Sequence, residues 1–302
     1  MIRKIVLSGG KGLIGKPLTQ ALIRDGAQVV LLVRRPAQSE VTAGVTEVEW
    51  HPEAPDPIAD PTPLEGSSAA VHLSGANVAD HRWTPSYKAT ILASRVDSSR
   101  ALKKIFAGLQ APPPVVVAAS ATGYYGDRGN EVLTEAAGPG SGFLAEVCQI
   151  WEAATSPLAA RIVQLRFSVV LTSRGGALPK LLGAFRLGLG GQMGSGRQWM
   201  SWVSLEDAVG AIQFAIAEPS LSGPCNTTSP FPVTNAEFTY TLGRLLHRPT
   251  FLRVPSFVLR AAFGEMASES VLASTRAVPE RLHAAGFQFS HERLEQAVSE
   301  MV

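Results

Sequence analysis

One stretch near the N-terminus constrains the fold more than any other part of the chain. An apolar run at residues 5–7 leads directly into three glycines spaced as Gly9-x-x-Gly12-x-x-Gly15, and a helical pattern begins at Leu13. A dinucleotide-binding site requires this strand–turn–helix order, whereas a glycine pattern without such flanks carries little information. The sequence therefore predicts a βα unit whose loop binds a dinucleotide. The alternative is a tight βα turn that binds nothing.

Each glycine of the motif has a separate expected role. Gly9 can adopt a positive φ at the tight turn, and Gly12 lets the main chain approach a pyrophosphate. Gly15 lets the helix pack close to the strand. The free N–H groups at the helix start, around Leu13 and Ile14, should then face the anion.

The residues after the second expected strand indicate which dinucleotide is bound. That strand, residues 28–33, ends in Arg34 and Arg35, where an acidic residue would accept hydrogen bonds from the ribose hydroxyls of NAD. Guanidinium groups instead bind the 2′-phosphate of NADP in a bidentate fork. Lys11 adds a third positive charge in the glycine loop. We therefore expect NADP(H), with a solvated basic loop as the alternative.

Composition excludes several classes of function. The chain has 302 residues and a net charge of +2 without a dense basic run, so nucleic acid is not an expected partner. It has no run of about 18 apolar residues, so we expect no membrane span. Cys148 and Cys225 match no metal or redox spacing, so we expect no metal site. These features favour a cytoplasmic monomer or homodimer that acts on a small molecule.

The hydrophobic pattern predicts the fold class. Apolar strand-like runs alternate with helical stretches through about residue 170, which indicates an α/β fold with a Rossmann-type, doubly wound parallel sheet. The expected strands are residues 5–7, 28–33, 47–50, 69–74, 115–119, 162–167 and 224–228. The two clearest helices of this part are expected at residues 86–108 and 143–154.

The pattern changes beyond about residue 172, where glycine-rich loops interrupt the chain. Ser204-x-x-Asp207 and Thr234-x-x-Glu237 have the form of capping boxes at two helix starts. We expect a dinucleotide-binding domain at residues 1–172, with its sheet completed by residues 203–230. A smaller, C-terminal substrate-binding lobe should comprise residues 173–202 and 231–302, with helical patches at 257–263, 271–273 and 291–301.

The glycine spacing is similar to that of extended short-chain dehydrogenases/reductases, and five further segments narrow the resemblance. They read VHLSGAN at 71–77, SATGYYG at 120–126, FRLGLGG at 185–191, GSGRQW at 194–199 and VTNAEF at 233–238. Together they resemble the atypical, nucleotide-sugar epimerase-like members of that group, which carry a C-terminal domain of unknown function. Some of these members are labelled cell-division-inhibitor-like. The resemblance implies a Rossmann fold and an NADP site, and it implies no particular substrate.

The resemblance also implies cofactor contacts at individual positions. The backbone of Leu73, Ser74 and Gly75 should pass under the adenosine. Arg95 stands where a polar residue, often asparagine, reaches the nicotinamide side of the cofactor. An arginine there could bind phosphate instead, or lie on the helix surface. Val170 should lie nearest the nicotinamide.

The usual proton-transfer pair of this family is missing. A tyrosine normally acts as general acid and base, and a lysine four residues later lowers its pKa. Phe143 and Val147 stand in these two places, and neither side chain can transfer a proton. Ser120 matches the serine that holds the substrate oxygen. Tyr124 and Tyr125 follow it closely, so either is a candidate acid unless both only pack beside the glycine turn.

Two functions remain open at this point. One is an NADP-dependent oxidoreductase or epimerase that acts on a small polar or nucleotide-linked substrate, in a cleft lined by Trp83, Ser120, Tyr124 and Arg197. Arginine and tryptophan there would suit an anionic or ring-bearing ligand. The other is a non-catalytic NADP(H)-binding sensor or regulator. The intact glycine loop and the missing tyrosine–lysine pair fit both.

Overall fold

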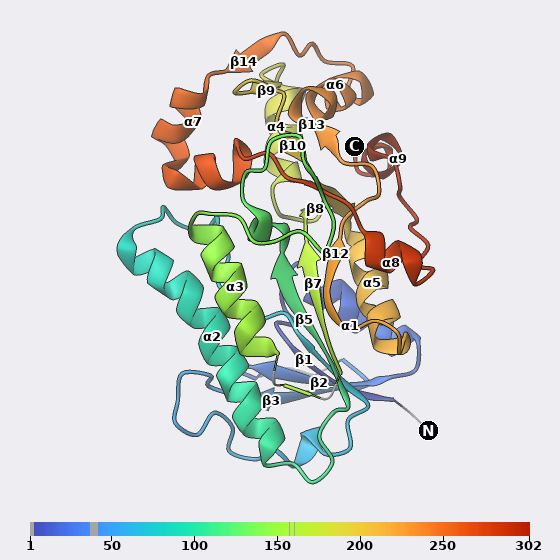
Figure 1. Cartoon of the computed structure of the whole chain (residues 1–302). Coiled ribbons are helices and arrows are strands. Elements are labelled where there is room, and N and C mark those ends of the chain that lie inside the picture. Colours follow the sequence, from blue (N-terminus) through green and yellow to red (C-terminus); the bar gives the residue numbers. More distant parts are fainter. Residues whose placement is uncertain (1–2, 37–41, 157, 160) are drawn as a thin grey trace.

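A parallel sheet forms the centre of the molecule (Figure 1). The computed structural model describes residues 3–36, 42–156, 158–159 and 161–302. Within them the strand order is β12-β7-β5-β4-β1-β2-β3, and all neighbouring strands are parallel. The bounds are β1 Lys4–Ser8, β2 Gln28–Val33, β3 Val45–Glu49, β4 Ala69–His72, β5 Val115–Ala121, β7 Arg161–Phe167 and β12 Gly223–Thr227. The strand order reverses between β1 and β4, which makes the sheet doubly wound, as the sequence predicts.

Helices cover both faces of the sheet, so its strands are buried on both sides. Figure 1 shows α1 (Gly15–Arg24) and α5 (Leu205–Ala217) on one face, and α2 (Pro85–Ala107) and α3 (Phe143–Thr155) on the other. Alternate side chains of each strand therefore enter different cores. In β1, Ile5 and Leu7 belong to one buried cluster and Val6 to the other. Such burial explains the continuous apolar runs in the sequence.

Side-chain caps begin several of the helices. Thr84 accepts a hydrogen bond from the Tyr87 amide at the start of α2. The box predicted at Thr234 is complete, because Thr234 and Glu237 bond each other's backbone at the start of α6. The box predicted at Ser204 is only half formed: Ser204 accepts from the Asp207 amide, but the Asp207 carboxylate accepts from the Ser204 hydroxyl and from two amides near α9 (Leu294–Ser299) and not from the Ser204 amide.

Further short elements lie mostly beyond the sheet, at the top of Figure 1. They are β6 Val132–Leu133, β8 Val169–Leu171, α4 Leu178–Arg186, β9 Gly191–Met193, β10 Trp199–Met200, β11 Trp202–Ser204, β13 Val233–Thr234, α6 Asn235–Leu245, β14 Leu252–Val254, α7 Ser256–Phe263, β15 Arg276–Ala277, α8 Glu280–Ala284 and α9 Leu294–Ser299. A separate buried cluster joins α4, α6 and α9 around Trp202 and Phe238. The division into two lobes is a proposal that agrees with this separate core.

Two sequence expectations need correction here. The helical patch expected at 271–273 is not an α-helix, because a π-turn, Ala267–Val271, ends there. The helix expected at 291–301 is shorter, since α9 spans Leu294–Ser299. Within the described residues, the structure contains no helix with the length and apolar character needed to cross a membrane.

Candidate functional site

The glycine loop after β1 lies directly against the loop after β4. Gly9 has the predicted positive φ, +76°. A Cβ atom on Gly9 would lie 2.7 Å from the carbonyl carbon of Leu73 and 3.0 Å from the Ser74 amide nitrogen. Only glycine fits this position, because both the backbone conformation and the close approach exclude a side chain. The loop that holds Leu73 to Gly75 is therefore adjacent to the glycine loop, as a cofactor site requires.

The other two glycines differ in what surrounds them. A Cβ atom on Gly15 would lie 2.2 Å from the Gly9 carbonyl oxygen, so Gly15 allows the close packing expected of it. A Cβ atom on Gly12 would contact only that same oxygen, at 3.2 Å, and otherwise face open space. Ile14 precedes α1 and provides no side-chain cap. The start of α1 therefore offers backbone N–H groups to an anion, and Gly12 leaves room for it.

The basic residues predicted to select NADP differ in whether their side chains already have an ion-pair partner. Arg34 and Arg35 are exposed just beyond β2, and their side chains make no hydrogen bond or ion pair with another described residue. Lys11, in contrast, forms an ion pair of 2.9 Å with the buried carboxylate of Glu47. Lys11 is therefore already paired with a carboxylate, whereas the two arginines are not, and a contact of Lys11 with a phosphate stays a prediction.

Arg95 is anchored inside the protein. Its Nη1 atom donates hydrogen bonds to the carbonyl oxygens of Ala76 (3.1 Å) and Ile91 (2.9 Å). Its guanidinium also lies 4.8 Å from the ring centroid of Trp151. Burial lowers the pKa of Arg95 from its ordinary value. These contacts hold the loop after Gly75 in place, and a direct contact of Arg95 with the cofactor stays a prediction.

A buried histidine ties the strands together beneath the two loops. His72 is completely buried at the end of β4. Its Nδ1 atom lies 2.6 Å from the Ser8 hydroxyl of β1, and its Nε2 atom lies 3.2 Å from the Ser99 hydroxyl of α2. Burial, helped by the charge of Arg95, lowers the pKa of His72 to about 4. The imidazole is therefore neutral at physiological pH.

The segment after β8 lies against the glycine loop. A Cβ atom on Gly175 would lie 3.0 Å from the Leu13 side chain, and one on Gly176 would lie 3.8 Å from the Val170 carbonyl oxygen. Val170 itself pairs with Val203 of β11. The arrangement brings the segment expected to cover the nicotinamide next to the loop expected to bind the pyrophosphate. The contact of Val170 with a nicotinamide stays a prediction.

Two apolar residues, Phe143 and Val147, stand at the positions of the usual tyrosine–lysine pair, and neighbouring side chains pack against Phe143. Phe143 begins α3 and packs edge to face on Trp83, with ring centroids 5.1 Å apart. The Lys88 ammonium lies 4.5 Å from the Phe143 ring centroid, and Val147 is buried. The Glu269 carboxylate accepts the amide hydrogens of Phe143 and Leu144 at 2.8 and 2.7 Å. Neither side chain that replaces the pair can move a proton.

A buried charged network occupies the carboxyl ends of β5 and β7 instead. The Ser120 hydroxyl donates to Glu152 Oε1 at 2.6 Å. Arg166 donates from Nε and Nη2 to the two oxygens of Glu152, both at 2.8 Å. The side chains of Arg166 and Glu152 are only 3% and 11% exposed. This bidentate pair satisfies both charges in a desolvated position.

The two candidate tyrosines have different environments around Arg166. The Arg166 guanidinium stacks 3.5 Å from the ring centroid of Tyr124, which is half-buried. Tyr125 is completely buried: its hydroxyl accepts from Arg166 Nη1 at 2.9 Å and donates to Asn226 Oδ1 at 2.7 Å. Burial raises the pKa of Tyr125 above its ordinary value. Burial and these two hydrogen bonds make Tyr125 a weaker candidate for the catalytic acid than the half-buried Tyr124, and a catalytic role of either tyrosine stays a prediction.

Sequence reasoning did not identify Glu152 or Arg166. Arg166 carried a signal, since it is the one charged residue inside the apolar run 162–167 and a charge there needs a buried partner. Glu152 carried none, because it reads as an ordinary polar residue of a helix. Ser120, which the sequence did identify, binds Glu152 and is itself buried. A contact of Ser120 with substrate stays a prediction.

The predicted substrate residues lie in different settings. Trp83 contacts Phe143 and donates from Nε1 to the Val78 carbonyl oxygen at 2.8 Å, so it lies at the start of α3. Arg197 is exposed in the turn between β9 and β10, where its amide donates to the Ser195 hydroxyl. No hydrogen bond, ion pair or ring contact joins Trp83 with Arg197 among the described residues. A common cleft for the two stays a prediction.

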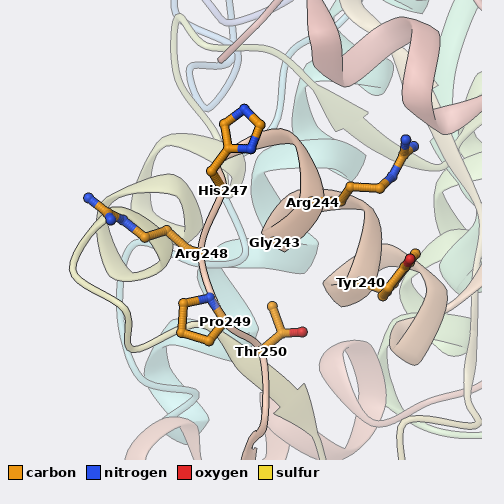
Figure 2. A pocket seen from close by; sticks show the side chains of 7 residues that line it. All are labelled: Tyr240, Gly243, Arg244, His247, Arg248, Pro249 and Thr250. Carbon is orange, nitrogen blue, oxygen red and sulfur yellow. The ribbon is translucent and has the colours of Figure 1, made fainter.

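Two surface hollows lie away from this site. One, of about 370 Å³, surrounds the end of α6 (Figure 2). Figure 2 shows that its side chains come from α6 and from the segment that follows it. Its lining residues are Tyr240, Gly243, Arg244, His247, Arg248, Pro249 and Thr250. The other, of about 360 Å³, lies at the start of α2 and includes His81, Arg82 and Tyr87. Neither contains the glycine loop or Tyr124.

The fold and the glycine loop together define a Rossmann-type nucleotide-binding protein of the short-chain dehydrogenase/reductase type. Residues 5–227 match the family model described as NAD dependent epimerase/dehydratase family, and residues 254–301 match a domain of unknown function, DUF1731. The chain belongs to the NAD dependent epimerase/dehydratase family. This agrees with the family resemblance that the sequence motifs indicate.

Relatives match the chain over almost its whole length. It is 45% identical to "Epimerase family protein MT2273" of Mycobacterium tuberculosis over 97% of this chain and 96% of that protein. It is 34% identical to "Epimerase family protein YfhF" of Bacillus subtilis over 99% of this chain and 97% of that protein. Among solved structures, the human epimerase family protein SDR39U1 with NADPH has a TM-score of 0.86 and 31% identity, covering 99% of this chain and 98% of that one.

Proposed function

We propose that this chain binds NADP(H) along the carboxyl edge of the sheet. The observation that carries the proposal is the glycine loop, where Gly12 faces open space beside the uncapped start of α1. Arg34 and Arg35 would hold the 2′-phosphate, and the loop from Leu73 to Gly75 would lie under the adenosine. The human relative crystallised with NADPH supports this choice of cofactor.

The reaction we propose is reduction of a carbonyl group, or the reverse oxidation, on a small polar or nucleotide-linked substrate. NADPH, when bound, would supply the hydride that the carbonyl carbon receives. Tyr124 donates its phenolic proton to the carbonyl oxygen, and the alcohol forms. Arg166 stacks on the face of the Tyr124 ring, 3.5 Å from its centroid, and would hold the ring in position for this transfer. Burial of the Arg166–Glu152 pair keeps Arg166 in this position.

A second function is favoured by the start of α3. Phe143 is covered by Trp83 and Lys88, and Glu269 occupies the first free amides of the helix. A protein that keeps the cofactor site and fills the usual proton-transfer position in this way would serve as a non-catalytic NADP(H) sensor or regulator. Oxidoreductase and sensor differ in one measurable property, the turnover of NADPH.

The experiment measures NADPH oxidation by the purified protein with a panel of aldehydes, ketones and nucleotide-linked keto sugars. The oxidoreductase proposal expects turnover with at least one of them and a loss of at least about 100-fold in kcat for Tyr124→Phe. Tyr240→Phe is the matched control, because Tyr240 is 65% exposed on α6. NADPH binding without turnover supports the sensor. Turnover that survives in Tyr124→Phe contradicts the role of Tyr124.

A further inference from the structure

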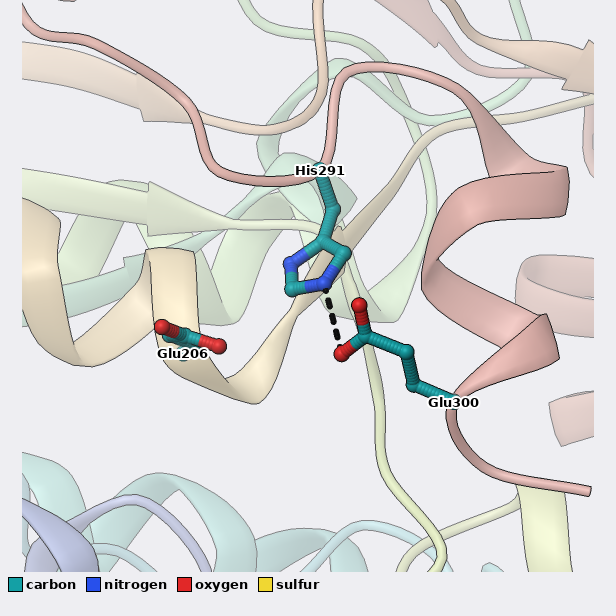
Figure 3. A group of neighbouring side chains, drawn as sticks. All are labelled: Glu206, His291 and Glu300. Atoms are coloured by element: carbon teal, nitrogen blue, oxygen red, sulfur yellow. Dashed lines mark hydrogen bonds and ion pairs between the residues drawn. The ribbon is translucent and has the colours of Figure 1, made fainter.

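A histidine and two glutamates from distant segments meet where the C-terminal segment packs against α5 (Figure 3). Glu206 lies in the first turn of α5, His291 precedes α9, and Glu300 directly follows α9. One oxygen or nitrogen atom from each residue lies within 4.8 Å of the other two. His291 is only 6% exposed, whereas both carboxylates face solvent. Figure 3 shows the imidazole between the two carboxylates.

The hydrogen bonds behind His291 determine which ring nitrogen carries a proton. The Ser204 hydroxyl donates to Asp207 Oδ2 at 2.8 Å and accepts the Asp207 amide hydrogen at 2.9 Å. His291 Nδ1 lies 3.2 Å from the same hydroxyl oxygen. A serine has one proton and two lone pairs, so the remaining lone pair of Ser204 accepts from Nδ1–H. The neutral imidazole therefore has its lone pair on Nε2.

That lone pair faces another electron-rich atom. His291 Nε2 lies 3.1 Å from Glu300 Oε2, and neither atom of this pair has a proton to offer when the imidazole is neutral. A proton on Nε2 or a metal cation between the two atoms resolves the conflict. With a metal bound, Ser204 and Asp207 act as the outer hydrogen-bond partners that orient a metal-binding histidine.

We propose that Glu206, His291 and Glu300 bind a divalent transition metal, with Zn²⁺ as the best chemical fit. Imidazole nitrogen and carboxylate oxygen are both common zinc ligands, and three protein ligands leave a fourth position for water. Within the described residues, neither glutamate forms an ion pair with lysine or arginine. Asp207 adds a further negative charge behind the histidine. The local charge therefore favours a cation.

The site has a structural role in this proposal. Glu206 lies in the segment that matches the epimerase/dehydratase family, and His291 and Glu300 lie in the segment that matches DUF1731. A metal bound to all three residues fastens the C-terminal segment to the sheet domain through α5. The sequence spacing gives no signal for it, because the first ligand stands 85 residues before the second.

The test uses the full chain, freed of metal with EDTA, and titrates it with Zn²⁺ by calorimetry and with Co²⁺ by visible absorption. We expect one Zn²⁺ per chain, Co²⁺ bands of a four- or five-coordinate site, and a higher melting temperature with Zn²⁺. The double variant Glu206→Gln, Glu300→Gln changes two exposed side chains, so it should fold and bind Zn²⁺ at least tenfold more weakly. Its melting temperature should no longer rise with Zn²⁺.

Two controls separate this site from adventitious binding. Glu295→Gln changes an exposed carboxylate of α9 outside the cluster, and His51→Gln removes the exposed histidine beside Glu49. Both should keep the high-affinity site. Equal Zn²⁺ affinity in the wild type and the double variant would overturn the proposal. So would NMR signals of the His291 ring that do not respond to Zn²⁺, because the imidazole would then not bind the metal.

Discussion

Two buried polar networks lie beneath the same edge of the sheet, and they differ in charge. Under the proposed cofactor half, His72 joins Ser8 and Ser99 as a neutral imidazole. Under the proposed proton-transfer half, Arg166 and Glu152 form an ion pair. The neutral network connects β1 and β4. The loops that follow these two strands would bind the cofactor mainly through backbone atoms. The charged network lies next to Tyr124, where side-chain chemistry is required.

The comparison shows that the two halves of the site are built from different kinds of contact. The cofactor half keeps the glycine at positive φ and the strand order that its family requires, although Arg95 stands where asparagine is often found. The other half has lost the tyrosine and lysine at Phe143 and Val147 and holds a charged cluster one strand away. A substitution in the charged network should therefore leave NADPH binding largely intact, and a substitution in the glycine loop should leave the Arg166–Glu152 ion pair largely intact.

The largest expected effect comes from breaking the charged network. Glu152→Ala leaves the Arg166 charge buried without its partner, which should lower the free energy of unfolding by about 3–5 kcal/mol. Urea denaturation measures this loss. Glu146→Ala, an exposed position on the same helix, should change it by no more than about 0.5 kcal/mol. Equal losses for the two variants would show that the ion pair does not stabilise the fold.

The neutral network should reveal itself in the pH dependence of stability. Above pH 6.5, the ordinary pKa of histidine, His72 is neutral in both the folded and unfolded states. As pH falls from 6.5 to about 4, the unfolded chain takes up a proton that the folded protein does not. Stability should fall over this range by about 3 kcal/mol.

Urea unfolding at pH 7 and at pH 4 tests this prediction when it is repeated with His72→Gln. Glutamine keeps polar atoms in the buried position and does not titrate, so the variant should lose about 3 kcal/mol less than the wild type between the two pH values. The same pH dependence in both proteins would mean that His72 is not the group responsible.

A smaller effect is expected for the ratio of NADPH to NADH affinity, which tests the proposed cofactor half of the site. NADPH should bind at least tenfold more tightly than NADH, about 1.4 kcal/mol, and the Arg34→Ala, Arg35→Ala double variant should lose this preference. Arg24→Ala, an exposed change at the end of α1, is the control. A double variant that still prefers NADPH would show that other groups select the phosphate.

Local sequence was sufficient to predict the sheet and the glycine loop. Their signals, an apolar strand, a glycine at positive φ and a helix start, lie within a few residues of one another in the chain. Seven strands were placed near their observed positions for the same reason, although β4 ends two residues before its expected end. The C-terminal patch at 271–273 failed, because packing against other segments decides a short segment there.

The charged network was beyond sequence reasoning for a physical reason. Ser120, Glu152 and Arg166 come from three elements, and only the sheet order brings β5 beside β7. Tyr124 and Tyr125 are adjacent in sequence, yet Tyr124 is half-buried and stacks on the buried Arg166, whereas Tyr125 is completely buried. The motif could not distinguish them, because the turn after β5 decides which ring faces inward.

The central claim is that the glycine loop binds NADP(H) independently of the chemistry next to it. A calorimetric titration of NADPH into the wild type and the Gly12→Val, Gly138→Val and Tyr124→Phe variants tests this claim most directly. Gly138 faces open space in a loop, which makes it the matched control for Gly12. The account predicts that Gly12→Val loses at least about 100-fold in affinity with an unchanged circular dichroism spectrum, while the other two bind as the wild type does. Normal NADPH binding by Gly12→Val would contradict it.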